Sequence, residues 1–200
     1  DTGLGDLAFS LGARATHHDL RLAMPVTSVD DLRSSLDAFV RREPRQGTVT
    51  GRRAATPPVT AFVFSGMGPQ WWGMGRQLLA EEPVFRTAVE RCDEFFRAVA
   101  GWSIIDEMAR DAEHSRMERA DVAQPANFVL QAGLTELWRS WGIVPDRIVG
   151  HSAGEVAAAW AAGILSLEDA VTVIYHRSRL QQQATDKGRM LAAGLSASRA

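Results

Sequence analysis

Residues 147 to 159 read Arg147-Ile148-Val149-Gly150-His151-Ser152-Ala153-Gly154-Glu155-Val156-Ala157-Ala158-Ala159. A short apolar run in this stretch ends in Gly-His-Ser-Ala-Gly, and an alanine-rich run follows at once. This order predicts a strand, a tight turn and a helix, the setting in which the pattern G-x-S-x-G forms a nucleophile elbow. We therefore expect Ser152 at the tip of the turn, with its hydroxyl oxygen exposed.

The residues around the serine have predictable roles. Glycine is needed at 150 and 154 because a Cβ would clash in so tight a turn. The backbone N–H of Ala153 opens the following helix, where amides lack partners and the helix dipole favours negative charge. This N–H can therefore be one donor of an oxyanion hole.

Composition argues against several classes of function. The chain has 200 residues, 46% of them hydrophobic, and a formal charge of −2, so its charge gives no reason to expect nucleic acid or an anionic membrane surface as a partner. Cys92 is the single cysteine, which excludes an intrachain disulfide and a cysteine metal cluster and makes a reducing, cytoplasmic setting the default. We expect no metal site.

The most apolar window, 143–167, carries charged residues and is not a membrane span. The first residues lack a signal-peptide pattern and an initiator Met, which indicates a piece of something longer.

A second strand is predicted at residues 59–64, a continuous apolar run typical of a strand buried on both faces. A glycine-rich loop follows, and its glycines let backbone amides approach a ligand or another loop closely. The loop lacks the Gly-Lys-Ser/Thr ending of a phosphate loop, which argues against nucleotide binding.

The remaining elements follow from helical spacing, caps and glycines. We expect a helix over 4–11 that ends at Gly12, a strand over 19–26 and a helix after the N-cap Ser28. Residues 41–58, without apolar periodicity, predict a surface linker or a boundary. Further helices are predicted at 83–100, 102–108, 124–141, 155–164 and 167 to about 187, and one more strand at 190–195.

The alternation of strands and helices predicts an α/β fold, with a mainly parallel sheet and helices on both faces, preceded by a small α+β unit. The inward stripe of the last helix includes Ile174, then Arg177 or Ser178, then Gln181. A buried guanidinium without a partner is costly. Arg177 is therefore expected to reach solvent, to pair with an acid or to hold an anionic ligand.

Three motifs in order along the chain resemble one family. They are residues 62–71 (FVFSGMGPQW), residues 150–155 (GHSAGE) and Arg177. Together they resemble the acyltransferase domain of type I polyketide synthases, to which animal-type fatty acid synthases and malonyl-carrier-protein transacylases are related. The resemblance runs over about residues 59–195. The preceding residues are similar to the linker that joins a ketosynthase to such an acyltransferase.

The resemblance implies ping-pong acyl transfer. Ser152 would attack the thioester of malonyl- or methylmalonyl-coenzyme A, and the phosphopantetheine thiol of an acyl carrier protein would then take the acyl group. Arg177 matches the position that binds the extender's carboxylate. The backbone N–H groups of Met67 and Ala153 would form the oxyanion hole. Gln70 would line the active site, and His151 would support it. No bound cofactor is implied.

The resemblance also implies a domain layout. Residues 1–43 would be the linker unit, 44–58 a connecting strap, 59–189 an incomplete large subdomain of the α/β-hydrolase-like kind, and 190–200 the start of a ferredoxin-like small subdomain. The family's general-base histidine would come after position 200. Because a serine hydroxyl without a base is a poor nucleophile at neutral pH, we expect this chain alone to be inactive or nearly so.

Two alternatives stay open. An α/β serine hydrolase or thioesterase would use the same elbow but would not need Arg177. An inactive, truncated docking fragment would fit the arginine-rich residues 41–53. Within the transferase interpretation, Ala153 and residues 119–125 give mixed signals, so malonyl and methylmalonyl extenders both remain open.

Overall fold

The computed structural model describes residues 3–185, 187 and 188. The chain divides into two compact units, Asp1–Pro58 and Val59–Ala200. The strand predicted at 190–195 and the small subdomain predicted from residue 190 lie outside the described residues.

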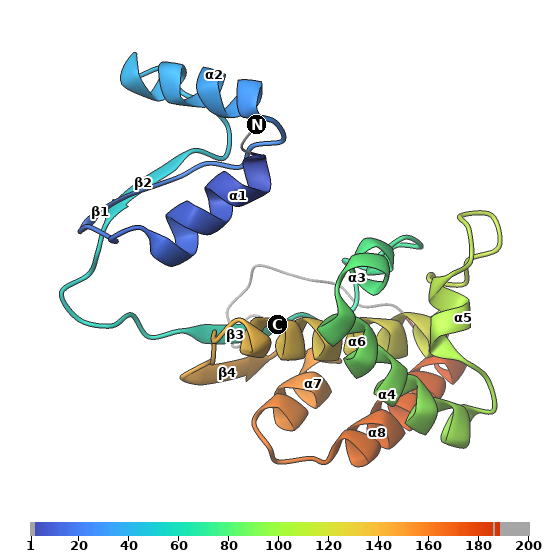
Figure 1. The fold of residues 1–200 in the computed structure, drawn as a ribbon. Coiled ribbons are helices and arrows are strands. Elements are labelled where there is room, and N and C mark those ends of the chain that lie inside the picture. Colours follow the sequence, from blue (N-terminus) through green and yellow to red (C-terminus); the bar gives the residue numbers. More distant parts are fainter. Residues whose placement is uncertain (1–2, 186, 189–200) are drawn as a thin grey trace, which may run out of the picture. The chain divides into compact units, whose positions relative to one another are not determined.

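The first unit combines an antiparallel strand pair with helices (Figure 1). Its elements in order are α1 (Leu4–Phe9), a π-helical turn (Ser10–Arg14), β1 (Leu20–Ala23), α2 (Val29–Val40) and β2 (Val49–Arg52). The two strands pair from Leu20 opposite Arg52 to Ala23 opposite Val49. Helix α2 begins where predicted, because the Ser28 hydroxyl accepts a hydrogen bond of 3.0 Å from the Asp31 N–H. This is the small α+β unit that the sequence predicts.

Two expectations for this unit differ from the structure. The first helical segment does not end at Gly12, because the π-helical turn continues to Arg14, whose guanidinium lies over the Phe9 ring. Residues 44–58 are not irregular throughout, since β2 forms within them. The partner of β2 is β1, on the far side of α2 in the sequence, and such non-local pairing leaves little trace in local composition.

The second unit contains a parallel strand pair, with β3 (Ala61–Phe64) beside β4 (Arg147–Gly150). Residues Ala61 and Phe64 lie opposite Arg147 and Gly150, so the two strands end together at their carboxyl ends. The predicted α/β fold with parallel strands is confirmed. The helices of this unit are α3 (Arg76–Glu81), α4 (Pro83–Ala100), α5 (Ile104–Met108), α6 (Ala120–Ser140), α7 (Gly154–Ala161) and α8 (Leu167–Gln183).

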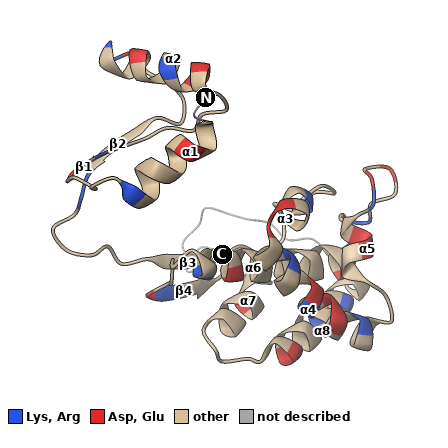
Figure 2. Ribbon diagram, viewed as in Figure 1, with Lys and Arg blue, Asp and Glu red and all other residues tan. Residues whose placement is uncertain are grey.

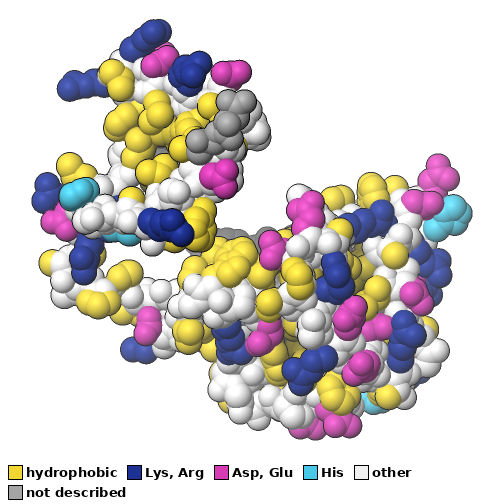
Figure 3. All heavy atoms as spheres, in the orientation of Figure 1, with side chains coloured by type: hydrophobic (Ala, Val, Ile, Leu, Met, Phe, Trp, Pro, Cys, Tyr) yellow, Lys and Arg dark blue, Asp and Glu magenta, His cyan; other side chains and the backbone are white. Residues whose placement is uncertain are grey.

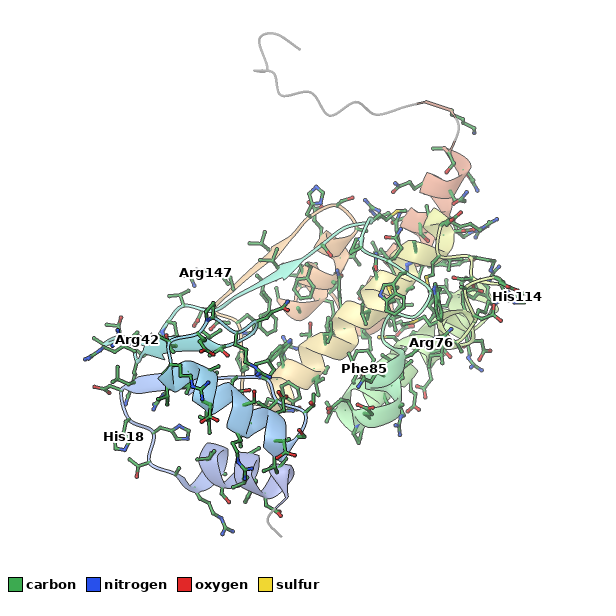
Figure 4. All side chains as sticks on the ribbon, turned by 90° about the horizontal axis from the view of Figure 1, so that it is seen from above. His18, Arg42, Arg76, Phe85, His114 and Arg147 are labelled. Carbon is green, nitrogen blue, oxygen red and sulfur yellow. The ribbon has the colours of Figure 1, made fainter. Side chains whose placement is uncertain are left out.

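Helices α4, α6 and α8 pack against one another and form the main core (Figure 1). Phe85, Phe96 and Phe128 are almost fully buried there. The Phe85 ring, labelled in Figure 4, lies against Gly133 of α6, where a Cβ would come within 2.5 Å of the ring. This close approach packs α4 tightly against α6, and α6 reaches the site described below.

The expectation that the strand at 59–64 is buried on both faces is wrong for the described residues. Phe64 is buried, whereas Val63 is 74% exposed. Its neighbour on β4, Val149, is 55% exposed. The sheet face that carries these valines is thus open, and helix α7 contacts both strands.

Helix α6 begins at Ala120, four residues before the predicted start. The reason is non-local, because the Ala120 N–H donates a hydrogen bond of 2.7 Å to Gln182 Oε1 on α8. Pro125 lies inside the helix and leaves the carbonyl of the residue four positions earlier without its usual donor.

In the described part of the chain, no helix combines the length and apolar character needed to cross a membrane.

Candidate active site

Ser152 lies at the turn between β4 and α7, as the elbow motif predicts, and its backbone is left-handed with φ of 55°. Left-handed backbone is unfavourable for a residue with a Cβ, so surrounding contacts must impose it. Those contacts involve the flanking glycines. A Cβ on Gly150 would come within 2.5 Å of Glu155 Cα, and one on Gly154 would overlap the Phe64 carbonyl. The side chain of Ser152 is exposed.

The loop after β3 lies directly against this turn. A Cβ added to Gly66 would lie 3.0 Å from the Ser152 Cβ and 3.0 Å from the His151 carbonyl oxygen. Gln131 of α6 supports the loop, because its side-chain Nε2 donates a hydrogen bond of 2.8 Å to the Ser65 carbonyl. The parallel pairing of β3 and β4 explains the approach, since both strands deliver their next residues to one edge.

Two backbone N–H groups near the serine are open. Among the described residues, no acceptor takes a hydrogen bond from the N–H of Met67 or of Ala153. Ala153 is buried and precedes α7, whose first amides carry the positive end of the helix dipole. Met67 follows Gly66 and is therefore close to the serine. Open amides in this arrangement can stabilise a developing oxyanion.

Arg177 of α8 reaches the serine. Its Nη2 donates a hydrogen bond of 3.2 Å to Ser152 Oγ. On the inward stripe of α8 the structure buries Ser178, together with Ile174 and Tyr175, and leaves Arg177 partly exposed at the rim. Of the two residues that the sequence left open at this position, Ser178 is therefore the buried one.

A buried glutamine that the sequence analysis did not assign to the site contacts Arg177. The Gln124 side chain is fully buried on α6, and its Oε1 accepts a hydrogen bond from Arg177 Nη1. Its Nε2 donates to Gln181 Oε1 at 2.8 Å and approaches Met67 Sδ at 3.3 Å. The available signal was one amide side chain within an otherwise apolar stretch, 122–126.

Unlike Arg177, the Gln70 and His151 side chains have no described hydrogen bond to Ser152. The Gln70 side-chain Oε1 accepts a hydrogen bond of 2.6 Å from the Gly68 N–H within its own loop. It also lines a cavity of about 240 Å³ whose described walls include Trp71 and Trp72 but not Ser152. His151 is exposed, and its backbone N–H donates to the Phe64 carbonyl at 3.0 Å.

The described hydrogen bonds bring no histidine imidazole to Ser152 Oγ. His17 bonds the Gly12 carbonyl. His114 bonds Asp111 in an exposed loop and lies at the outer edge of the unit (Figure 4). The base that a serine nucleophile requires is therefore not among these side chains.

Outside the serine site, the described part of this unit holds no metal-ligand cluster and no reactive thiol. Acidic and basic residues both occur on its helices (Figure 2), and both signs lie side by side on the surface shown in Figure 3. The described residues contain no group of three His, Cys, Asp or Glu side chains that could hold a metal ion. Burial raises the pKa of the Cys92 thiol to about 12, so this cysteine is not a nucleophile.

The fold and this site define a class of protein. A serine on a strained strand–turn–helix elbow beside two backbone amides is an arrangement typical of nucleophilic acyl chemistry. The comparison with known proteins agrees. A family model described as "Acyl transferase domain" matches residues 61–200, and the chain belongs to this family.

The relatives are polyketide synthases. The chain is 41% identical over 177 residues to a highly reducing polyketide synthase, pks5, of Leptosphaeria maculans. It is 32% identical, with a TM-score of 0.78, to the crystal structure of the acyltransferase domain from module 8 of the salinomycin polyketide synthase. It is 29% identical, with a TM-score of 0.72, to the acyl transferase domain of SpnD in complex with 2-(pent-4-yn-1-yl)malonyl.

The chain covers a small share of these relatives. The match to the fungal synthase takes in 88% of this chain and 7% of the relative. The match to the salinomycin domain takes in 90% of this chain and 42% of that domain, and the match to the SpnD domain 89% and 41%. The site described above thus corresponds to one part of an acyltransferase domain.

Proposed function

We propose that this chain carries the nucleophile and the carboxylate-binding arginine of an acyltransferase that moves a malonyl or methylmalonyl extender from coenzyme A to the phosphopantetheine thiol of an acyl carrier protein. The observation that carries the proposal is the 3.2 Å hydrogen bond from Arg177 Nη2 to Ser152 Oγ. A cation at the nucleophile suits an anionic acyl group, whereas hydrolysis of an ordinary ester needs none there.

The reaction has two halves. In the first, Ser152 Oγ attacks the thioester carbonyl carbon and loses its proton to a general base, the C–S bond breaks, and coenzyme A leaves as its thiol. In the second, the phosphopantetheine thiol attacks the acyl-serine, the C–O bond breaks, and Ser152 regains its proton. The N–H groups of Met67 and Ala153 stabilise the oxyanion in both halves.

The short distance between Arg177 and Ser152 Oγ indicates the class of acyl group. In a malonyl or methylmalonyl group, one carbon separates the reacting carbonyl from a carboxylate. An arginine within hydrogen-bond distance of Ser152 Oγ can therefore hold this carboxylate while the serine bonds the carbonyl carbon, and a planar guanidinium matches a carboxylate in two parallel hydrogen bonds. The substituted malonyl group in complex with the related SpnD domain supports this class.

Smaller roles belong to two other residues and to the first unit. Gln70 and His151 would line the site rather than touch the reacting atoms. The Gln70 side-chain oxygen bonds its own loop, and no described hydrogen bond joins either side chain to Ser152. The match to the fungal synthase aligns 177 residues, more than the second unit contains. This extension supports residues 1–43 as the linker to an adjacent ketosynthase domain.

The test is intact-mass measurement of acyl adducts on the full-length domain, with malonyl- and methylmalonyl-coenzyme A offered separately. Wild type should gain one acyl group, and the heavier adduct would identify methylmalonyl as an accepted extender. Ser152→Ala should gain none, while Ser140→Ala, which changes an exposed serine at the end of α6, should behave as wild type. Arg177→Ala should slow malonyl loading by roughly 10- to 100-fold, since a hydrogen bond to a charged group contributes about 1.5–3 kcal/mol.

Two results would refute the proposal. An acyl adduct on folded Ser152→Ala would remove Ser152 from the chemistry. Equal loading of malonyl and acetyl groups in both wild type and Arg177→Ala would remove Arg177 from carboxylate binding and favour a hydrolase-like site.

A further inference from the structure

Gln124 is a polar side chain in an apolar place. It lies on the inner face of α6, is fully buried, and has Val122, Ala123 and Ala126 as buried neighbours on the same helix. A buried amide costs free energy unless its hydrogen bonds are satisfied. Here the partners of both ends of the amide are residues at the active site, and none is a backbone group of the core.

The amide joins three segments of the site. Its Oε1 accepts a hydrogen bond from Arg177 Nη1, and its Nε2 donates to Gln181 Oε1 one turn further along α8 at 2.8 Å. Arg177 Nη1 also donates to Gln181 Oε1, at 3.2 Å, so the two glutamines and the guanidinium form a closed ring of contacts. The same Nε2 approaches Met67 Sδ at 3.3 Å, which ties the ring to the loop after β3.

The two terminal nitrogens of the Arg177 guanidinium have different partners. Nη1 is occupied by neutral amide oxygens, while Nη2 points to Ser152 Oγ. The described residues offer Arg177 no carboxylate within 4.0 Å, in contrast to Arg97 and Arg116, which pair with Asp93 and Glu107. Neutral partners fix the orientation of the side chain without neutralising its charge, so the charge remains available to a ligand.

We propose that Gln124 is the positioning residue of the carboxylate subsite, holding Arg177 by Nη1 so that its remaining N–H groups meet the carboxylate of an acyl group on Ser152. This inference rests on the proposed function, because it assumes that Arg177 binds an acyl carboxylate. It assigns the preference for carboxylated acyl groups to a buried residue on α6 as well as to the arginine on α8.

The test uses two substitutions at Gln124 in the full-length domain. Gln124→Met keeps the length of the side chain and removes its hydrogen bonds to the guanidinium. Gln124→Glu keeps an oxygen acceptor for Arg177 but introduces a charge that pairs with the guanidinium and competes with the ligand. Gln182→Met is the matched control, since Gln182 also links α6 to α8, through the Ala120 N–H, and no described hydrogen bond joins it to Arg177.

The readout is the ratio of kcat/KM for malonyl-coenzyme A to that for acetyl-coenzyme A, which lacks the carboxylate. In Gln124→Met we expect this ratio to fall by roughly tenfold, as for loss of one hydrogen bond to a charged group. In Gln124→Glu the ratio should fall further, through a higher KM for malonyl-coenzyme A. Gln182→Met should leave the ratio unchanged.

A purely structural role predicts a different pattern. If Gln124 only stabilises the helix pair, both Gln124 variants would change the two substrates equally, and that result would overturn the inference. Arg177→Ala distinguishes failure of the proposed function from failure of the role given to Gln124. A ratio that is unchanged in Arg177→Ala contradicts the proposed function itself, whereas a ratio that falls in Arg177→Ala but not in the Gln124 variants contradicts only the role of Gln124.

Discussion

Arg177 Nη2 donates a hydrogen bond of 3.2 Å to Ser152 Oγ, although the two residues are 25 positions apart on different elements. The serine is held by the turn after β4, and the arginine projects from α8. Because Oγ acts as the acceptor, the hydroxyl proton stays free for transfer to a base. The nucleophile and the cation are therefore brought together by packing of α8 on the elbow, before any acyl group arrives.

The left-handed backbone of Ser152 should have a measurable cost. We expect Ser152→Gly to be more stable than Ser152→Ala by about 1 kcal/mol, because glycine tolerates φ of 55° and alanine does not. Both variants lack the nucleophile and should be equally inactive, so activity serves as the internal control. Urea unfolding of the two variants side by side measures the difference. Equal stabilities would mean that the elbow carries no strain.

The glycine after the elbow should tolerate no side chain. A Cβ on Gly154 would overlap the Phe64 carbonyl, so the start of α7 would have to move away from the end of β3. We expect Gly154→Ala to lower the free energy of unfolding by about 1–3 kcal/mol and to abolish acyl loading. Gly51→Ala is the control, since a Cβ there meets nothing within 4 Å. A stable, fully active Gly154→Ala variant would contradict the described approach of β3 to the turn.

Features fixed by neighbouring residues were predicted from the sequence, whereas features fixed by contacts with distant segments were missed. The elbow was predictable because two glycines and a serine at fixed spacing are demanded by the geometry of one turn. The early start of α6 was missed because Gln182, from α8, accepts the hydrogen bond of its first N–H. Strand β2 was missed for the same kind of reason, since its stability comes from β1.

The candidate site shows the same division. Periodicity brought Arg177 to the correct side of α8 but left open whether it or Ser178 is buried. The role argued for Gln124 depends on contacts with α8 and with the loop after β3, and no local pattern encodes these. Gln70 was assigned to the active site by resemblance; its side-chain oxygen bonds its own loop, and its role at the site stays a prediction.

A buried carboxylate holds the loop after α5. Glu107 is 2% exposed. Its Oε2 accepts a hydrogen bond of 2.9 Å from Arg116 Nε and forms an ion pair with Arg110 Nε at 2.9 Å. Removing Arg116 leaves the carboxylate with fewer partners in a poorly solvated place. We expect Arg116→Ala to lower the free energy of unfolding by about 2 kcal/mol. Arg119→Ala, which breaks only the exposed pair with Asp121, should change the melting temperature far less.

Cys92 should be chemically silent in the folded protein. Its thiol is fully buried, and burial raises its pKa to about 12, whereas an unperturbed thiol has a pKa of about 8.5. At pH 8 the thiolate is therefore scarce as well as inaccessible. We expect iodoacetamide to leave the folded chain unmodified and to add one group after denaturation in urea, as intact mass would show. Full modification without denaturant would mean that helix α4 opens readily.

The first unit should lose stability in acid through Asp31. Its carboxylate accepts hydrogen bonds from the Thr27 N–H at 2.9 Å and the Thr27 hydroxyl at 3.2 Å, and it pairs with Arg45. The backbone hydrogen bond from Thr27, followed by the Thr27 hydroxyl and Arg45, lowers the pKa of Asp31 in the folded state. A carboxylate with a lowered folded pKa stabilises the protein above its ordinary pKa, and this stabilisation is lost as the pH falls through the folded pKa.

Asp31→Asn should therefore lower the melting temperature of this unit at pH 7, and the difference from wild type should shrink as the pH drops below about 4. Asp30→Asn is the matched control, because it removes the same charge from the same helical turn but breaks only an exposed contact of 3.7 Å with Arg33. Circular dichroism melts at pH 7 and pH 3 measure both variants. A difference between wild type and Asp31→Asn that is as large at pH 3 as at pH 7 would show that the hydrogen bonds from Thr27 do not depend on the charge of Asp31.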